Sequence, residues 1–320
     1  MSGLLEADLE HLVTMAAFAP SVHNTQPWHF RPAPGGLRLE RDRSRQLTVI
    51  DPMGRELLLS CGAALHHLEV AARGVGVDSR VTINPVGNTV ATVRLSRGRP
   101  ATNAELAHAL AILHRHTYRG RFDDERIPAA ALDAIAGAAT HEHGLVRIVS
   151  DEELVEVEVL VSRAERTLVS SPGYQEELAR WVWHGAPDEN RGDGIPAAAV
   201  DHGPDRAESL EGRQFDGAAD PRPEDPPDPE HPTVLLLSSP SDTPFDWIQA
   251  GRALSALLLL ATELGVVAQP IGQVLDLPAS RRELALALGT VGSPQMLLRL
   301  GRGQAAPQTP RRAVADVLAL

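Results

Sequence analysis

Residues 19–30 read APSVHNTQPWHF, and two prolines bracket the polar side chains of this stretch. Pro20 ends helix propagation from the residues before it, and Pro27 removes one backbone donor from the strand that follows. The backbone groups at a helix end need partners outside the helix. Ser21 and Asn24 are therefore candidates to hold the polar edge of a ligand. The alternative is that both side chains serve only the local backbone, which is frequent in turns.

The composition is that of a globular protein, with 43% hydrophobic and 22% charged residues in a chain of 320. The longest apolar run, residues 253–261, is interrupted by Ser255 and is shorter than the roughly 20 residues that span a bilayer. The first residues, MSGLLEADLEHL, are acidic rather than basic, unlike a signal peptide. We therefore expect a cytoplasmic protein with no membrane partner.

Charge and residue usage exclude several kinds of partner and chemistry. The formal net charge of −12 argues against nucleic acid, because binding to a phosphate backbone needs clustered positive charge. The chain contains no lysine, so a Schiff base, a pyridoxal phosphate anchor and a Walker loop are all excluded. The single cysteine, Cys61, excludes an internal disulfide. The histidines, including the adjacent His66 and His67, lack metal-ligand spacing, so we expect no metal site and assign this pair to the core or surface.

An internal repeat divides the chain. Six small or aliphatic residues recur at a constant spacing of 189, from Gly62 to Gly76 and again from Gly251 to Gly265. Both stretches have the pattern of a core helix that ends in a glycine cap. A second pair, residues 92–98 and 297–303, reads as a short strand near the end of each half. The repeat favours duplication and predicts an N-terminal half over 1–104 and a C-terminal half over 105–320.

The segment 185–232 is rich in Asp, Glu, Gly and Pro and predicts neither a packed helix nor a strand. Long segments of this kind in a compact domain are either lids or solvated tethers. Both readings stay open for this insertion.

A second polar constellation opens the C-terminal half. Arg115, Thr117 and Arg119 alternate before Phe122, and a helix is predicted to begin near Pro128. Guanidinium groups bind phosphate in a bidentate manner, so this run is a candidate anion site.

These motifs resemble those of the nitroreductase superfamily. The 19–30 stretch is similar to the superfamily's flavin-binding turn, Pro-Ser-x-x-Asn-x-Gln-Pro-Trp, and the Arg115 run is similar to its Arg-x-Ser-x-basic segment. Pro270-Ile271-Gly272-Gln273 is similar to a loop that faces the central flavin ring, and Thr309-Pro310-Arg311-Arg312 to a terminal basic pair at the phosphate. The order of these strings and of CGAAL, ELARW, DGIP and LLRLGRG is most similar to the Acg-type, duplicated branch of actinobacteria.

The resemblance implies an α+β fold, with a mixed, mostly antiparallel central sheet wrapped by helices and two fused halves that mimic a dimer. It implies flavin mononucleotide (FMN) as the cofactor. By the same resemblance the cofactor-binding residues are Pro20, Ser21, Val22, Asn24, Gln26, Arg115, His116, Thr117, Arg119, Pro270, Ile271, Gly272, Gln273, Arg311 and Arg312.

Within this set, individual roles also follow from the resemblance. Arg115 and Arg312 are the expected phosphate ligands, and Arg119 is expected nearer the ring, where a cation would favour the reduced flavin. Arg311, like Arg121, is expected to be a surface charge. Gly272 is expected to allow close approach of the backbone to the flavin.

Each half carries only one of the two signatures. The first half has no Arg-rich segment before its first helix, predicted over residues 4–18, and the second half has THEHGLVRIV where the Asn-x-Gln-Pro-Trp turn would follow its helix at 129–139. We therefore expect one FMN per chain, bound between the halves.

The implied activity is hydride transfer from NADH or NADPH to the flavin, and then to a small-molecule acceptor such as a nitroaromatic or a quinone, in a ping-pong cycle. One alternative is a storage or sequestering protein in which the insertion covers the flavin and allows little turnover. A flavin-free interaction protein is a third hypothesis. Pairing of two chains into a homodimer is left open.

Overall fold

The computed structural model describes residues 6–183, 191–196, 199, 232–304 and 308–319. Within them, the strands form two four-stranded antiparallel sheets and one two-stranded parallel sheet, with helices around them. The predicted α+β class with mostly antiparallel strands is confirmed, although most of the described strands are divided between two four-stranded sheets instead of forming one central sheet. Among the described helices, none combines the length and apolar character needed to cross a membrane.

The elements follow one another in two series. The first series is α1 (Glu6–Ala17), η1 (Val22–Asn24), β1 (Trp28–Ala33), β2 (Gly36–Arg41), η2 (Arg43–Arg45), α2 (Arg55–Gly74), β3 (Val77–Ile83), β4 (Thr89–Arg97) and α3 (Asn103–His114). The second series is α4 (Ala129–His141), β5 (Leu145–Ile148), α5 (Asp151–Val169), α6 (Pro172–Trp181), β6 (Val182–Trp183), β7 (Ile195–Pro196), β8 (Thr233–Ser239), α7 (Pro244–Glu263), β9 (Val267–Ile271), α8 (Gln273–Asp276), α9 (Pro278–Ala287), β10 (Ser293–Gly301) and α10 (Val314–Val317).

Capping boxes fix the starts of three helices. Thr102 caps α3, Ser150 caps α5 and Thr243 caps α7, each through the backbone N–H three residues further on. In each case the acidic residue at that third position accepts from the backbone of the cap. These reciprocal bonds satisfy donors that a helix start otherwise leaves free.

The two sheets have the same topology. The strand order of the first sheet is β1-β2-β4-β3 and that of the second is β5-β8-β10-β9, with α2 and α7 at corresponding places in the chain. Every described pair within these two sheets is antiparallel. This correspondence supports the duplication that the 189-residue repeat indicates.

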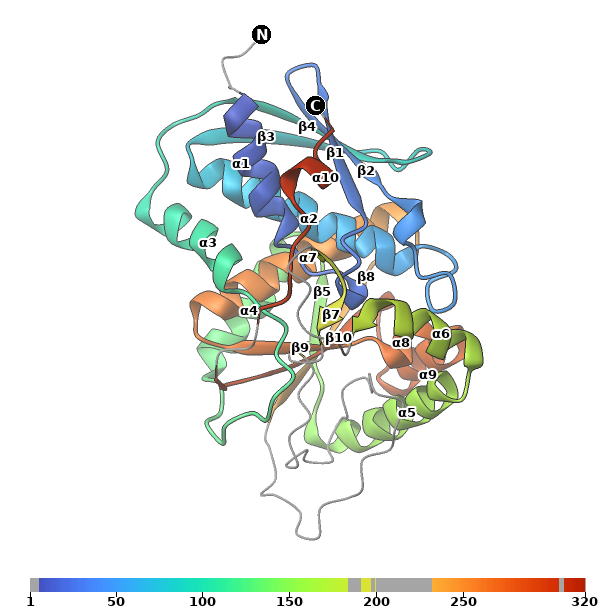
Figure 1. Cartoon of the computed structure of the whole chain (residues 1–320). Helices are drawn as coiled ribbons and strands as arrows, with labels where there is room; N and C mark the ends of the chain where they lie inside the picture. The colour runs from blue at the N-terminus through green and yellow to red at the C-terminus, as the bar shows by residue number, and fades with distance from the viewer. Residues whose placement is uncertain (1–5, 184–190, 197–198, 200–231, 305–307, 320) are drawn as a thin grey trace.

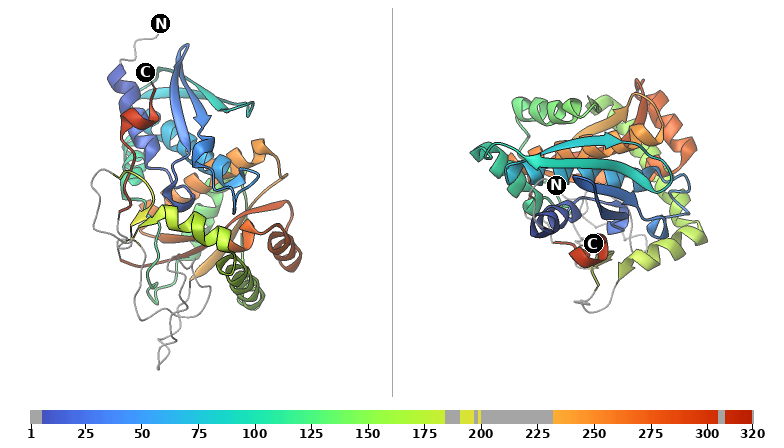
Figure 2. Two further views of the ribbon diagram at one scale, coloured as in Figure 1. Left: turned by 45° about the vertical axis from the view of Figure 1, so that its right-hand side comes forward. Right: turned by 90° about the horizontal axis from the view of Figure 1, so that it is seen from above.

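Helices α2 and α7 cross between the two sheets (Figures 1 and 2). They cross at the repeated glycines: a Cβ on Gly62 would lie 2.1 Å from the Ile248 carbonyl oxygen, and one on Gly251 would lie 1.9 Å from the Leu59 carbonyl oxygen. Ile248 follows Leu59 by the same 189 residues as Gly251 follows Gly62. The crossing is therefore two-fold symmetric at the level of single residues.

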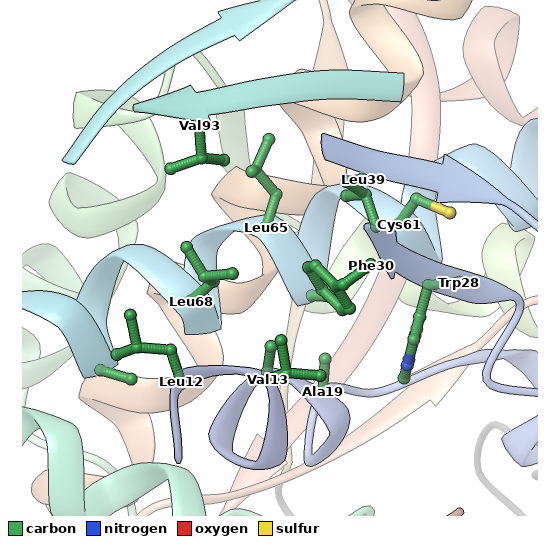
Figure 3. Packing of buried hydrophobic residues seen from close by; sticks show 14 of the residues in the cluster. Leu12, Val13, Ala19, Trp28, Phe30, Leu39, Cys61, Leu65, Leu68 and Val93 are labelled. Carbon is green, nitrogen blue, oxygen red and sulfur yellow. The ribbon is translucent and has the colours of Figure 1, made fainter. Parts of the chain in front are cut away.

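The core of the first half lies between α2, α1 and the first sheet (Figure 3). Leu65 and Leu68 of α2 contact this core together with Trp28 and Phe30 of β1, and all four side chains are fully buried. The cluster also contains Val317 and Leu318 from the C-terminal end of the chain.

The C-terminal segment crosses from the second half back to the first. After β10, the chain passes the 19–26 turn, and α10 lies beside α1 (Figure 1). Leu318 then forms a parallel bridge with Phe30, and the Ala319 N–H donates to the Phe30 carbonyl. The predicted boundary at 104 falls inside α3, which packs against both α2 and α7, so the division into 1–104 and 105–320 stays a proposal.

Candidate functional site

The turn that follows α1 has an unusual backbone. His23, Asn24 and Gln26 have positive φ angles of 48°, 54° and 48°. This left-handed conformation costs a non-glycine residue roughly 1–2 kcal/mol. The Ser21 hydroxyl accepts from the Gln26 N–H at 2.9 Å and helps to hold the conformation. Ser21 thus serves the local backbone, as in the alternative reading of this turn.

Asn24 and Gln26 tie the turn to two distant segments. The Asn24 amide donates to the carbonyls of Gly194 at 2.9 Å and of Pro310 at 3.0 Å. The fully buried Gln26 amide donates to the Gly192 carbonyl at 2.7 Å and accepts from the Arg312 N–H at 2.9 Å. The amides of both predicted flavin ligands therefore bind protein groups in this structure.

Two arginines converge beside this turn. Arg115 and Arg311 each donate from Nη2 to the Phe18 carbonyl, both at 3.2 Å. Arg311 also donates to Asn24 Oδ1 at 3.3 Å, so that Arg311 and the Phe18 carbonyl it shares with Arg115 connect the two predicted signatures from opposite halves of the chain. The end of a helix suits cations, because its last carbonyls point outward.

Among the described residues, no acid balances the charges of this pair. Arg115 is only 4% exposed, and neither arginine forms an ion pair in that part of the chain. The Nε atoms of both are buried and have no hydrogen-bond partner among the residues that the structure describes. Burial first, and then the nearby Arg311 and Arg119, lower the pKa of Arg115 to about 9, while burial lowers that of Arg311 to about 10. Because guanidinium stays protonated in proteins, these lowered pKa values indicate the cost of burying two charges, to which the neighbouring arginines add at Arg115.

This arrangement bears on the two predictions about the terminal basic pair. Arg311 is not a surface charge, since its guanidinium also donates to the Thr309 hydroxyl at 2.7 Å and lies over the Phe18 ring. Arg312, the expected phosphate ligand, donates instead to the carbonyls of Gln26 and Asp316. Burial and then Arg45 lower the pKa of Arg312, whereas three nearby acids, Asp42, Asp316 and Asp193, raise it. Arg311 is thus the member of the pair that joins Arg115.

The other residues of the predicted Arg-rich segment lie next to the pair. His116 is half-buried, and its pKa is lowered to about 4 by burial and then by Arg115 and Arg311. Thr117 forms a parallel bridge with Ala268, at the start of β9. The Arg119 guanidinium donates to the Ala199 carbonyl at 3.3 Å, and burial lowers its pKa to about 10.

The predicted 270–273 loop comes directly after the Thr117–Ala268 bridge in the chain. Pro270 and Ile271 end β9, Gly272 precedes α8, and Gln273 is buried as its first residue. Gly272 has an ordinary right-handed backbone with φ −93° and ψ −25°, so it needs no conformational freedom of glycine. Leu277, just after α8, and Val22 of the 19–26 turn pack against the same apolar cluster. Pro20 lies two residues before Val22 in that turn.

Most of the predicted insertion, namely 185–190, 197–198 and 200–231, lies outside the described residues. Its described part, residues 191–196 and 199, supplies the Gly192, Gly194 and Ala199 carbonyls noted above. These carbonyls and that of Phe18 were not predictable as site groups, because backbone atoms carry no sequence signal.

Comparison with known proteins identifies the family. The model of the nitroreductase family matches residues 112–302. A Mycobacterium tuberculosis protein provisionally named as an NAD(P)H nitroreductase, Rv3131, is 33% identical over 321 residues, with 96% of this chain and 90% of the relative covered.

The chain belongs to the nitroreductase family.

The family's Acg-type branch is represented by the M. tuberculosis protein named acg, which is 30% identical over 318 residues, with 97% of this chain and 94% of that protein covered. Among solved nitroreductases, the FMN-bound enzyme of Bacteroides fragilis is 17% identical and aligns with a TM-score of 0.39 over 64% of this chain and 92% of its own. The resemblance stated from the sequence motifs is therefore confirmed at the level of family and branch.

Proposed function

We propose that this chain binds one FMN between its halves and acts as an NAD(P)H-dependent oxidoreductase. The observation that carries the proposal is the pair of Arg115, which is buried, and Arg311, which is half-buried with a buried Nε; among the described residues neither has a carboxylate partner and neither Nε has a hydrogen-bond partner. Two largely buried cations side by side are costly unless an anion joins them. A phosphate dianion on the ligand suits two guanidinium groups. The family membership supports FMN as the source of that phosphate.

The residues around the pair fit the other parts of the cofactor. Arg119 adds positive potential next to Arg115, as required of a cation that favours a reduced, anionic ring. The 270–273 loop is joined to the Arg115–Arg119 segment through the Thr117–Ala268 bridge, and we assign it to the ring. Asn24 holds Arg311 in place through its side-chain oxygen.

The chemistry that FMN supplies when bound is hydride transfer in two half-reactions, from NADH or NADPH and then to a nitroaromatic, quinone or other conjugated acceptor. The protein groups assigned here bind and orient, and none serves as a nucleophile or a strong base. The strained 19–26 turn positions Asn24, and the buried arginines fix the phosphate end. We propose the ping-pong order because both substrates would approach the same ring.

Titration of the purified protein with FMN, followed by flavin fluorescence, tests the binding proposal. Arg115→Gln and Arg311→Gln should each weaken FMN binding by roughly tenfold to a hundredfold, because each removes a charge-assisted contact. Arg312→Gln is the matched control and should change the affinity by no more than about threefold, since it has acids nearby. Equal losses in Arg311→Gln and Arg312→Gln would contradict the assignment of the phosphate to Arg115 and Arg311.

A second candidate function is storage or sequestration of FMN. The described part of the insertion favours it, because the Gly192 and Gly194 carbonyls bind the turn and the Ala199 carbonyl binds Arg119. Anaerobic addition of NADPH to the FMN-loaded protein separates the two functions. Bleaching at catalytic speed supports the oxidoreductase, whereas resistance that deletion of residues 200–231 relieves supports sequestration.

A further inference from the structure

The outer faces of the two sheets, which point away from the crossing of α2 and α7, differ in what covers them. On the second sheet, an apolar cluster joins Leu297 of β10 to Val157 and Leu160 of α5. On the first sheet, the strands lie in front of the helices when the molecule is seen from above, and no described helix covers them (Figure 2). Among the described residues, the first sheet therefore has an open outer face, whereas a helix packs on that of the second.

Arginine stands on each of the four strands of this open face. Arg31 of β1 lies directly opposite Arg38 of β2, and Glu40 pairs with both, at 2.8 Å and 2.9 Å. Arg80 of β3 lies directly opposite Arg94 of β4. Both of these side chains are exposed, and neither forms an ion pair with another described residue. Like charges directly opposite one another destabilise a sheet, so an acid placed between Arg80 and Arg94 would stabilise it.

The internal repeat shows what accompanies the equivalent arginine in the second half. Arg94 of β4 and Arg299 of β10 are the third residues of the repeated stretches TVRLSRG and LLRLGRG, and the two strands hold the same place in their sheets. Arg299 is buried, and it donates at 2.8 Å to Gln269, which lies directly opposite on β9. The helix packed on this face, α5, carries Glu158, and the charge of Arg299 opposes the rise in pKa that burial causes there. The second half thus places a glutamate-bearing helix and a neutral cross-strand partner where the first half has a second arginine and no cover.

We propose that the outer face of the first sheet is a docking surface for another protein, which lays an acidic helix across Arg80 and Arg94. Carboxylates from such a helix would pair with the two opposed guanidinium groups, as Glu40 does with the neighbouring pair. The helix would occupy the place that α5 occupies on the second sheet. The net charge of −12 favours a local acidic element over a long polyanion or an anionic membrane, because the rest of the surface repels an extended negative charge.

Fluorescence anisotropy with a labelled peptide tests this surface. The probe is a peptide of alanine and glutamate, about 20 residues long so that it forms a helix, with the glutamates on one face. Its control peptide has glutamine in place of glutamate. We expect the full chain to bind only the glutamate peptide at low salt, with an affinity that falls as salt is added. Arg80→Glu and Arg94→Glu should each weaken binding by roughly tenfold, because each removes an attraction and adds a repulsion.

Arg282→Glu provides the matched control. It makes the same change of charge at an exposed residue of α9, which lies at the far end of the molecule from the first sheet (Figure 1), so the affinity should change by no more than about twofold. Loss of binding in Arg80→Glu does not result from unfolding if the variant melts no lower than wild type. We expect that result, because the new acid lies opposite Arg94.

The outcomes that overturn the proposal are distinct. Equal affinity of the wild type for the two peptides, no binding of either, or equal losses in Arg80→Glu and Arg282→Glu removes the acidic helix as the occupant. Tighter binding of a DNA duplex or of phosphatidylserine vesicles than of the glutamate peptide assigns the face to a different class of partner. Sedimentation of the wild type as a dimer that Arg80→Glu dissociates assigns it to a second copy of this chain.

Discussion

At the scale of single residues, the site combines two costly features: a strained turn and buried, uncompensated charge. His23, Asn24 and Gln26 are all left-handed, and Arg115 and Arg311 are held side by side. Such costs persist only where surrounding contacts over-determine the geometry. Here the contacts come from the 191–196 segment and from residues 309–312, so the strain is supported by parts of the chain far away in sequence.

Asp51, before α2, gives the first prediction at this scale. Its carboxylate accepts from the Leu57 N–H at 2.9 Å, but burial and the nearby Glu56 raise its pKa to about 7. In the unfolded chain this pKa is about 3.9. The folded state therefore binds the proton more tightly, so the contribution of Asp51 is fully present below about pH 4 and is lost as pH rises through about 7.

We expect Asp51→Asn to remove this pH dependence, because the amide oxygen still accepts from Leu57 and carries no charge. Its gain in unfolding free energy over wild type should grow from near zero at pH 4 to roughly 3–4 kcal/mol at pH 8. Urea unfolding of both proteins at pH 5, 6, 7 and 8 measures this difference in unfolding free energy. Titrating groups that behave alike in the two proteins cancel in the difference. A difference that stays constant over this range would contradict the assignment.

The sequence of the turn predicted which residues meet, but not what each one does. Arg115 and Asn24 come together through Arg311, as the motif order indicates. The roles of Gln26 and of Arg311 against Arg312 were not predictable, because their partners lie up to 293 residues away. Nothing in a run of two arginines tells which guanidinium turns toward Phe18 and which toward Asp316.

At the scale of elements, the crossing of α2 and α7 joins the two halves. Gly62 and Gly251 let each helix approach the other's backbone, and His66 bonds Ser255, the residue that follows it by 189. The sequence repeat predicted both helices and their glycines. It did not predict that the same glycines form the contact, since small residues inside a helix fit burial against any neighbour.

Gly62→Ala tests this crossing. The added Cβ would lie 2.1 Å from the Ile248 carbonyl oxygen, so the helices must separate, and we expect a loss of about 3 kcal/mol or more of unfolding free energy. Gly137→Ala on α4 is the control, because a Cβ there meets no atom within 4 Å. Alanine favours helix over glycine by up to about 1 kcal/mol, so this variant should be more stable than wild type. Thermal and urea unfolding of both variants give the comparison, and equal stabilities would show that the crossing tolerates a wider spacing.

At the scale of the whole molecule, the two halves repeat a topology but differ at the position of the turn. The arginine pair lies beside the turn after α1, whereas other side chains occupy the corresponding space beside the turn after α4. Glu142 there binds Arg252 at 2.8 Å, and a Cβ on Gly144 would lie 2.8 Å from that of Ala253. Arg252 of α7, the arginine beside this second turn, is thus already paired with an acid. The duplicated fold therefore has one turn whose neighbouring arginine is paired with an acid, and one whose arginine pair has no acid partner among the described residues.

This asymmetry predicts one FMN per chain. Native mass spectrometry of the FMN-loaded protein should show each chain with the added mass of a single FMN, and Arg311→Gln should lose it while Arg312→Gln keeps it. Two FMN per chain would mean that the turn after α4 also binds, against the Glu142–Arg252 ion pair. One FMN for every two chains would place the site between molecules, although Arg115 and Arg311 of one chain already share the Phe18 carbonyl. A single FMN per chain is the ratio that we expect, because the shared Phe18 carbonyl brings Arg115 and Arg311 to one point beside the 19–26 turn within the same molecule.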